Sequence, residues 1–218
     1  MDRFVITGCG HSGTGWAARA MTMLGYPCGH EWAFNLEHVG RFVGLRGDAS
    51  WLAMPHVLAL HPSVRVVHLR RDPLEVVKSV YCSNFLRHHC TCGHEPGAHR
   101  NEPYVQYILR FYPDLWDNKT DIERAISWVI WWNRRFDLDV NPKQAFRLED
   151  VSQDPVALED MVDYLVGEIP PRRAIEAVQA AIPRNTNSHR RAPWDVEIPE
   201  NSWGEELALL REEYGYCI

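Results

Sequence analysis

A glycine-rich segment near the amino terminus constrains the fold more than any other part of the sequence. The segment Phe4–Trp16 has four glycines within eight residues, between a short apolar run typical of a buried strand and a stretch with helical spacing from 16 to 24. Glycine allows tight turns and close approach to a ligand, and the first N–H groups of a helix have no partner within the helix. The segment predicts either an anion-binding loop, to which Ser12 and Thr14 add hydroxyls, or a purely structural turn.

The loop lacks two residues that nucleotide hydrolysis requires. The spacing of Gly8 and Gly13 matches the first part of a Walker A loop, but Thr14 and Gly15 follow where that motif has Lys and then Ser or Thr. Without the lysine and the metal-binding hydroxyl, ordinary NTP hydrolysis and kinase chemistry are disfavoured.

A second anion site is predicted some sixty residues further along. The run 64–69 is dense in β-branched residues, as in a buried strand of a parallel sheet, and Pro73 after it is typical of the first position of a helix. Ser79 then lies nearly two turns into that helix, on a face that can approach the Arg71 guanidinium, and together they would form a phosphate clamp. Because α/β sheets bind ligands at the carboxyl ends of their strands, the two sites predict one ligand with two separated phosphate-type groups.

Length and composition favour a single α/β domain over residues 1–218, with three α/β/α layers and a mainly parallel sheet. The formal net charge of −6 disfavours nonspecific nucleic-acid binding. No apolar run is long enough to span a bilayer and the amino terminus has no signal-peptide pattern, so we expect a cytoplasmic protein without a membrane partner. Six scattered cysteines are not typical of a disulfide framework, and no feature of the sequence indicates an oligomeric state.

Glu31 is the candidate general base. It follows the first predicted helix, in a turn that should emerge near the mouth of the glycine loop, and it is flanked by the apolar residues Trp32 and Phe34. Apolar neighbours raise the pKa of a carboxyl group toward the range useful for a base. The alternative is that Glu31 pairs with an arginine or caps a helix.

A cluster of cysteines and histidines between 82 and 99 has two interpretations. The segment supplies plausible zinc ligands, of which the best placed are Cys82, Cys90, Cys92 and His94. Their spacing is not one of the common zinc motifs, so the other interpretation is a polar loop that binds the acceptor or acts as a lid.

The clearest helical pattern covers residues 121–139, and its apolar face carries Trp128, Trp131 and Trp132. These tryptophans suggest base stacking, but core packing is the favoured interpretation. A strand is predicted at 143–148, and helices at 156–166 and 171–182.

The motifs together resemble the PAPS-dependent sulfotransferase family, which binds 3′-phosphoadenosine 5′-phosphosulfate (PAPS) on a P-loop NTPase-like fold without a metal. The resemblance lies in the loop His11–Trp16, in Arg71-Asp72-Pro73 with Ser79 eight residues after Arg71, and in Phe146–Asp150 followed by Asp154-Pro155. It extends from Phe4 to about Gly167. The segment 82–118 would be a variable insertion for the acceptor or a lid.

The resemblance implies a role for each part of the predicted site. The 5′-phosphosulfate would be bound by the loop residues His11, Ser12, Gly13, Thr14, Gly15 and Trp16. The 3′-phosphate would be bound by Arg71 and Ser79, and a late loop would add Arg190 or Arg191, unless that tail is only solvated. Glu31 stands where some bacterial relatives have their base.

His11 and Gly15 depart from the family pattern. Relatives carry Lys or Arg at the position of His11 and a hydroxyl residue at that of Gly15. A histidine provides a cation only when protonated, and a phosphate beside it raises its pKa, so we expect transfer to weaken as pH rises above that pKa.

The implied activity is transfer of a sulfuryl group from PAPS to a hydroxyl or amine of a small-molecule or glycan acceptor, with Glu31 as base and His11 offsetting charge on the departing oxygen. Two alternatives stay open: a P-loop-type phosphotransferase or kinase of a small molecule, and a non-catalytic nucleotide-binding module.

Overall fold

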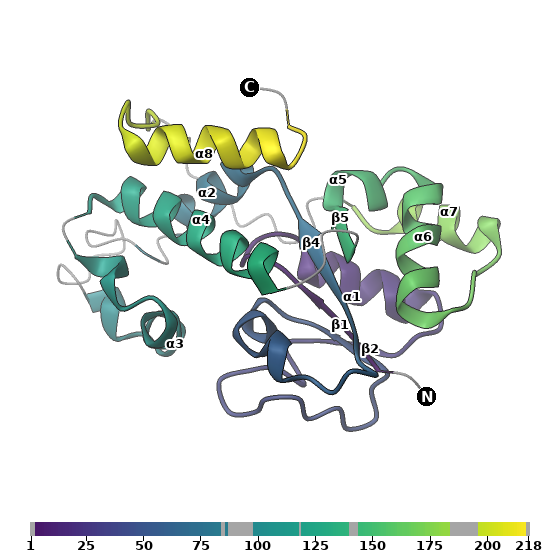
Figure 1. The fold of residues 1–218 in the computed structure, drawn as a ribbon. Coiled ribbons are helices and arrows are strands. Elements are labelled where there is room, and N and C mark those ends of the chain that lie inside the picture. Colours follow the sequence, from purple (N-terminus) through teal and green to yellow (C-terminus); the bar gives the residue numbers. More distant parts are fainter. Residues whose placement is uncertain are drawn as a thin grey trace. The chain divides into compact units, whose positions relative to one another are not determined.

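The computed structural model describes residues 3–83, 86, 98–117, 119–139, 144–183 and 196–216. These residues group into two compact units (Figure 1). Unit 1 comprises Met1–Arg71 and Phe136–Ser188, and unit 2 comprises Asp72–Arg135 and His189–Ile218. The expectation of a single domain over 1–218 stays a prediction.

Unit 1 is built on a parallel sheet. Its described strands are β1 (Phe4–Thr7), β2 (Cys28–His30), β3 (Gly47–Ala49), β4 (Arg65–Arg70) and β5 (Ala145–Arg147). Their order is β2-β3-β1-β4-β5, and every neighbouring pair is parallel. In the centre, Ile6 of β1 pairs with Ala49 on one side and Val67 on the other, so all four residues of β1 are buried.

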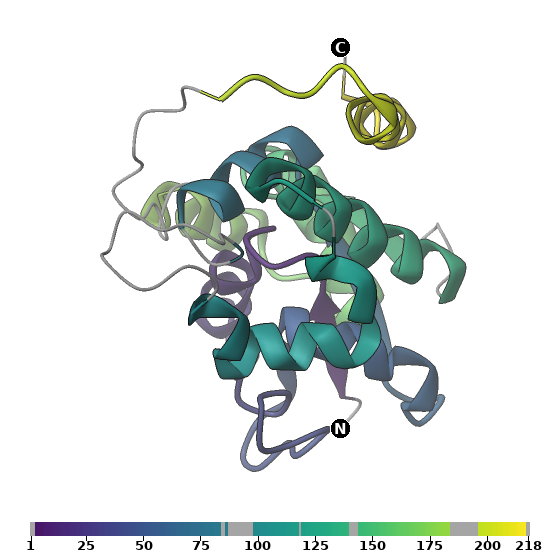
Figure 2. The same cartoon turned by 90° about the vertical axis from the view of Figure 1, so that its left-hand side faces the viewer.

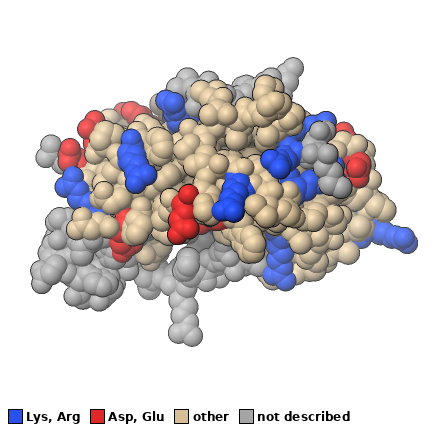
Figure 3. Space-filling model, turned by 90° about the horizontal axis from the view of Figure 1, so that it is seen from below, with Lys and Arg blue, Asp and Glu red and all other residues tan. Residues whose placement is uncertain are grey.

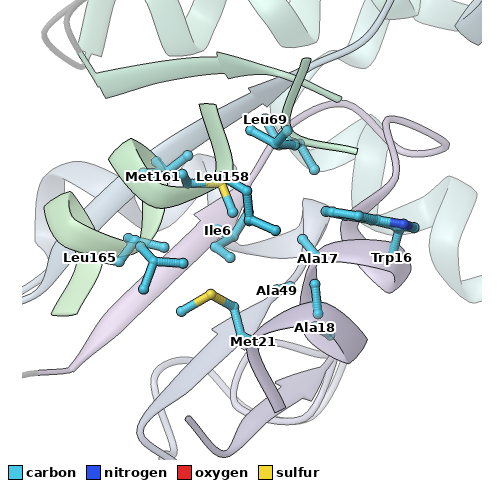
Figure 4. Close-up of a cluster of buried hydrophobic side chains, with 14 of the residues drawn as sticks. Ile6, Trp16, Ala17, Ala18, Met21, Ala49, Leu69, Leu158, Met161 and Leu165 are labelled. Carbon is cyan, nitrogen blue, oxygen red and sulfur yellow. The ribbon is translucent and has the colours of Figure 1, made fainter. Parts of the chain in front are cut away.

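One face of this sheet carries the main hydrophobic core. Helices α1 (Thr14–Met23), α6 (Pro155–Val166) and α7 (Arg172–Ala181) contribute apolar side chains that meet Phe4, Ile6, Val67 and Leu69 of the strands. Figure 4 shows Ile6 and Leu69 among side chains of α1 and α6. Alternation along a strand sends these four residues to one face and leaves Thr7 and His68 on the other.

The opposite face is covered by other segments of unit 1. The 3-10 helix η1 (Trp51–Ala59) packs beside β1, and the ring of Phe136 lies 4.0 Å from that of His68. Trp51, Leu52 and Ala53 of this helix are buried, whereas Leu58 is 67% exposed. A parallel sheet flanked by helices confirms the predicted α/β fold class and is consistent with three layers.

Unit 2 is helical in the part that is described. It contains α2 (Pro73–Cys82), η2 (Ala98–Asn101), α3 (Pro103–Phe111), η3 (Pro113–Trp116), most of α4 (Asp121–Asp139) and α8 (Ser202–Glu213). In Figure 2, α8 is seen nearly end-on. Complete burial of Trp128 and Trp132 confirms core packing for both, while Trp131 stacks on Tyr112 with ring centroids 5.3 Å apart. None of the described helices combines the length and the apolar character needed to cross a bilayer.

Candidate active site

The glycine loop lies between β1 and α1, and two of its glycines are sterically required. A Cβ on Gly8 would collide with the Leu69 carbonyl oxygen and lie 2.7 Å from Ser12 Oγ. Gly13 has φ of 101°, and a Cβ there would lie 2.5 Å from the side chain of Leu148. Only glycine fits these two places without a shift of the surrounding atoms.

The start of α1 offers hydrogen-bond donors to an anion. Gly13 caps the helix without any side-chain hydrogen bond, and the N–H of Ala17 is the first to bond back, to the Gly13 carbonyl at 3.1 Å. The N–H groups of 14–16 therefore have no partner within the helix, and the helix dipole adds partial positive charge there.

A buried hydroxyl adds an independent indication of a ligand. Ser12 is 1% exposed, and its Oγ has no hydrogen-bond partner among the described residues; the same holds for Thr7 Oγ1. Leaving a buried hydroxyl unpaired costs about 1–3 kcal/mol. An anion in the loop would remove this cost at Ser12.

The predicted loop residues 11–16 thus lie together, but the side chain of Trp16 points away from the loop into the core. Its ring is 2% exposed within the core of unit 1, and its Nε1–H faces the Ile182 carbonyl at 3.4 Å. Only the backbone N–H of Trp16 is placed to serve an anion, whereas Thr14 and Ser12 bring side chains to the loop.

Arg71 lies beside the glycine loop. It follows β4, the neighbour of β1, and its Nη1 donates a hydrogen bond to the His11 carbonyl at 3.1 Å. The chain leaves β1 toward β2 on one side of the sheet and leaves β4 toward β5 on the other. Such a reversal between adjacent parallel strands is where α/β folds form ligand crevices.

The other predicted site residues stay predictions. Ser79 lies in α2, within unit 2, and its role stays a prediction. Cys82 ends the same helix. Cys90, Cys92, His94, Arg190 and Arg191 lie outside the described residues, and the described part of the chain has no group of three or more His, Cys, Asp or Glu side chains that could hold a metal.

Glu31 is held close to the loop by its neighbours. It follows β2, and its N–H bonds to the Ala49 carbonyl at 3.3 Å. His30 Nε2 lies 3.7 Å from Glu31 Oε1 and 3.3 Å from the hydroxyl of Thr14, the first residue of α1. The Glu31 carboxylate therefore forms its described ion pair with a histidine rather than with an arginine.

Burial raises the pKa of Glu31 above the usual carboxyl range, as predicted. The charge of His30 opposes this rise in pKa, Asp48 adds to it, and a side-chain hydrogen bond with Trp51 lowers it again. Asp48 is fully buried and accepts hydrogen bonds from the N–H groups of Trp32 and Phe34 at 3.1 and 3.2 Å, yet burial raises its pKa too.

His11 and Glu31 share an unusual backbone conformation. Their φ angles are 67° and 58°, and among the described residues they are the two non-glycine residues with positive φ. Each such residue costs about 1–3 kcal/mol and persists only where its surroundings enforce it. Residues of this kind concentrate at functional sites, and these are the two that the sequence nominates as catalytic.

Sequence reasoning missed His30 and Asp48. The signal for His30 was its position next to Glu31 at the end of a strand, but that strand was not predicted. Asp48 sits between Gly47 and Ala49 in an equally short strand, and its role depends on backbone N–H groups that only the fold brings to it.

Charge on the surface gives a weaker indication of partners than the site does. On the face shown in Figure 3, the described Lys and Arg side chains stand singly or in small groups among uncharged residues, with Asp and Glu between them. This face has the mixed character of an ordinary protein surface.

Comparison of the chain with models of protein families, with curated proteins and with solved structures found no match. The function of the site is therefore inferred from its own geometry and from the sequence motifs that it contains.

Proposed function

We propose that this protein is a PAPS-dependent sulfotransferase that transfers a sulfuryl group to a hydroxyl or amine of a small-molecule or glycan acceptor. The observation that carries the proposal is the hydrogen bond from Arg71 to the His11 carbonyl, which puts a guanidinium beside an anion-binding loop. PAPS has an anionic group at each of two positions on its ribose, and the loop with Arg71 offers donors for both.

In this proposal the 5′-phosphosulfate binds at the start of α1. The N–H groups of 14–16 donate to its oxygens, and the unpaired hydroxyl of Ser12 gains a partner. Arg71, which donates one N–H to the His11 carbonyl, has the planar guanidinium that suits a phosphate, and in the proposal it binds the 3′-phosphate. Ser79, and Arg190 or Arg191, are the further 3′-phosphate ligands that the sequence resemblance suggests.

The transfer itself needs a base and a stabilised leaving group. Glu31 takes the acceptor proton as the acceptor oxygen or nitrogen attacks sulfur, so that the new bond to sulfur forms while the bond from sulfur to the bridging phosphate oxygen breaks. The departing oxygen keeps the electron pair of that bond. Protonated His11 offsets the resulting negative charge, and the proton that Glu31 has taken leaves to solvent.

Calorimetry with the product nucleotide, 3′-phosphoadenosine 5′-phosphate, tests the binding site. The Arg71→Ala variant should bind it about 5- to 150-fold more weakly, as expected for loss of a charge-assisted contact worth about 1–3 kcal/mol. AMP, which lacks the 3′-phosphate, should bind both proteins alike. Arg41→Ala is the matched control, because it removes one exposed arginine of unit 1 outside the site.

Three results would contradict the proposal. The first is no binding of the bisphosphate nucleotide, and the second is equal affinity in the Arg71→Ala variant. The third is Mg²⁺-dependent turnover of ATP, which would assign the site to a phosphotransferase. Tight binding without turnover across a broad acceptor screen with labelled PAPS would instead favour the non-catalytic module.

A further inference from the structure

A single ring nitrogen of His30 lies between the glycine loop and the candidate base. Nε2 is 3.3 Å from Thr14 Oγ1 and 3.7 Å from Glu31 Oε1. We propose that His30 is a positioning residue for the base: its ring lies between Thr14 and Glu31 and fixes the Glu31 carboxylate beside the loop. The inference rests on the proposed role of Glu31, and it adds a residue and a function to that site.

The fold fixes both contacts of His30. It is the last residue of β2, and its pairing with Ala49 in β3 sets where the strand ends. Thr14 is 4% exposed at the first position of α1, so its hydroxyl has little freedom. The side chain of His30 is 40% exposed and that of Glu31 is 24% exposed, so the pair stands at the border between protein and solvent.

The chemistry of Nε2 suits both neighbours. When it carries a proton, this nitrogen can donate to the Thr14 hydroxyl oxygen, while the ring stays at ion-pair distance from the Glu31 carboxylate. A protonated ring also attracts the Glu31 carboxylate, more strongly than in water because the carboxylate is partly desolvated.

Without the charge of His30, the surroundings of Glu31 would raise its pKa further. Burial and the neighbouring carboxylate of Asp48 on β3 both raise the pKa of Glu31, and a side-chain hydrogen bond with Trp51 of η1 opposes them. A positive charge on His30 acts against Asp48, since it lowers the pKa of Glu31 and also that of Asp48. A carboxyl group must be ionised to accept the acceptor proton, so the charge of His30 bears directly on catalysis.

Titration of Glu31 by NMR tests the inference without any ligand or acceptor. With glutamate labelled at the carboxyl carbon, the Glu31 signal is identified by its loss in Glu31→Gln. In His30→Gln the signal should titrate at a higher pH than in the unsubstituted protein, because the opposing charge is gone. His30→Lys, which retains a cation, should bring the titration back down, and His38→Gln should leave it unchanged as the control in the same loop.

Turnover supplies the second readout. At the pH where Glu31 is half ionised in the unsubstituted protein, His30→Gln should lower kcat about tenfold. The loss of kcat should shrink as pH rises, because Glu31 then ionises in the variant as well. Affinity for 3′-phosphoadenosine 5′-phosphate should stay within about twofold, because the backbone N–H groups of 14–16, the Ser12 hydroxyl and Arg71 are untouched.

The outcomes separate this inference from the proposed function. An unmoved Glu31 titration in His30→Gln, or a loss of kcat that is equal at every pH, would overturn the role of His30. A protein that neither binds the bisphosphate nucleotide nor turns over PAPS, yet shows the shifted titration, would retain the His30–Glu31 link and lose the sulfotransferase assignment.

Discussion

At the scale of single residues, the site depends on two side chains held in backbone conformations that L-residues rarely adopt. The hydrogen bond from Arg71 to the His11 carbonyl fixes one of them, and the bond from the Glu31 N–H to the Ala49 carbonyl fixes the other. The surrounding strands can enforce such strain because β1, β3 and β4 are paired through the centre of the sheet.

Glu31→Gln should remove the base and leave nucleotide binding intact. We expect kcat to fall by about 10²–10⁴, the usual contribution of a positioned base. Affinity for 3′-phosphoadenosine 5′-phosphate should not change, since Glu31 does not contact the loop donors directly. Steady-state kinetics and calorimetry on the same samples check both expectations; a kcat that stays within threefold would remove Glu31 from the mechanism.

The activity of the unsubstituted protein should rise and then fall with pH. It rises as Glu31 loses its proton, at a pH above the usual carboxyl range because burial raises its pKa. It falls at higher pH as His11 loses its charge. His11→Lys should extend activity to higher pH, since lysine stays protonated about four pH units further than an unperturbed histidine.

A pH–rate profile of His11→Lys and His11→Ala decides this prediction. We expect the alanine variant to be slow at every pH. An alkaline limb at the same pH in the lysine variant, or an alanine variant of unchanged rate, would show that the charge of His11 has no part in the reaction.

At the scale of elements, the glycine turn depends on the space behind it as well as on its backbone. Gly13→Ala should destabilise the protein by about 2–4 kcal/mol, because positive φ and contact with Leu148 act together. Gly25 also has positive φ, of 93°, but a Cβ there meets no atom within 4 Å. Gly25→Ala should therefore cost only about 1–2 kcal/mol.

Urea unfolding of the two alanine variants measures the difference. If both variants lost the same free energy of unfolding, backbone strain alone would account for the cost, and the contact with Leu148 would relax without a further cost.

The start of α2 depends on an arginine from α8. Asp72 Oδ1 accepts from the N–H of Leu74 at 2.9 Å, and Arg211 binds both oxygens of the same carboxylate at 2.9 and 3.2 Å. We expect Arg211→Ala to lower the free energy of unfolding by about 1–3 kcal/mol, since both side chains are largely buried.

Arg134→Ala is the control for Arg211→Ala. Its ion pair with Glu213 is exposed, and such pairs contribute about 0–1 kcal/mol. Denaturant unfolding of both variants should rank Arg211 well above Arg134, and a reversed order would contradict the proposed role of Arg211 at the start of α2.

The sequence predicted the elements that have strong patterns of their own. β1, β4 and β5 and helices α1, α2, α4, α6 and α7 lie within a few residues of their predicted positions. β2 and β3 were missed because Cys28-Gly-His30 and Gly47-Asp-Ala49 have no β-branched residues. They are strands because their neighbours supply hydrogen bonds, and Gly47 allows the Phe4 ring to lie against its backbone. α8 was missed as well, since only Leu207 and Leu210 of its residues are buried.

At the scale of the whole molecule, the loop and Arg71 were predictable as a pair. Motifs that follow two strands of one parallel sheet meet at one edge whenever those strands are neighbours. The contact partners of Glu31 were not predictable, because His30 and Asp48 reach it through two strands with no sequence signal. The sequence thus identified the anion-binding residues more fully than the surroundings of the base.

Metal removal tests the proposed mechanism on the intact protein. Sulfuryl transfer as proposed has no step that uses a metal, so dialysis against a chelator should leave kcat within about twofold, in contrast to the large losses when a catalytic metal is removed. Elemental analysis of the same sample tests whether zinc is bound, for which Cys82, Cys90, Cys92 and His94 are the candidate ligands. A large loss of activity that Mg²⁺ restores would contradict the mechanism, and one that zinc restores together with the folded state would assign zinc to structure.

The contact between Gly13 and Leu148 links distant parts of unit 1. Leu148 begins the short helix α5 (Leu148–Val151) directly after β5, yet its methyl groups occupy the space that a side chain at position 13 would need. In any set of natural homologues these two positions should therefore covary in volume: a bulkier residue than leucine should be rare at 148 while 13 is glycine, and a residue other than glycine at 13 should occur with a smaller one at 148.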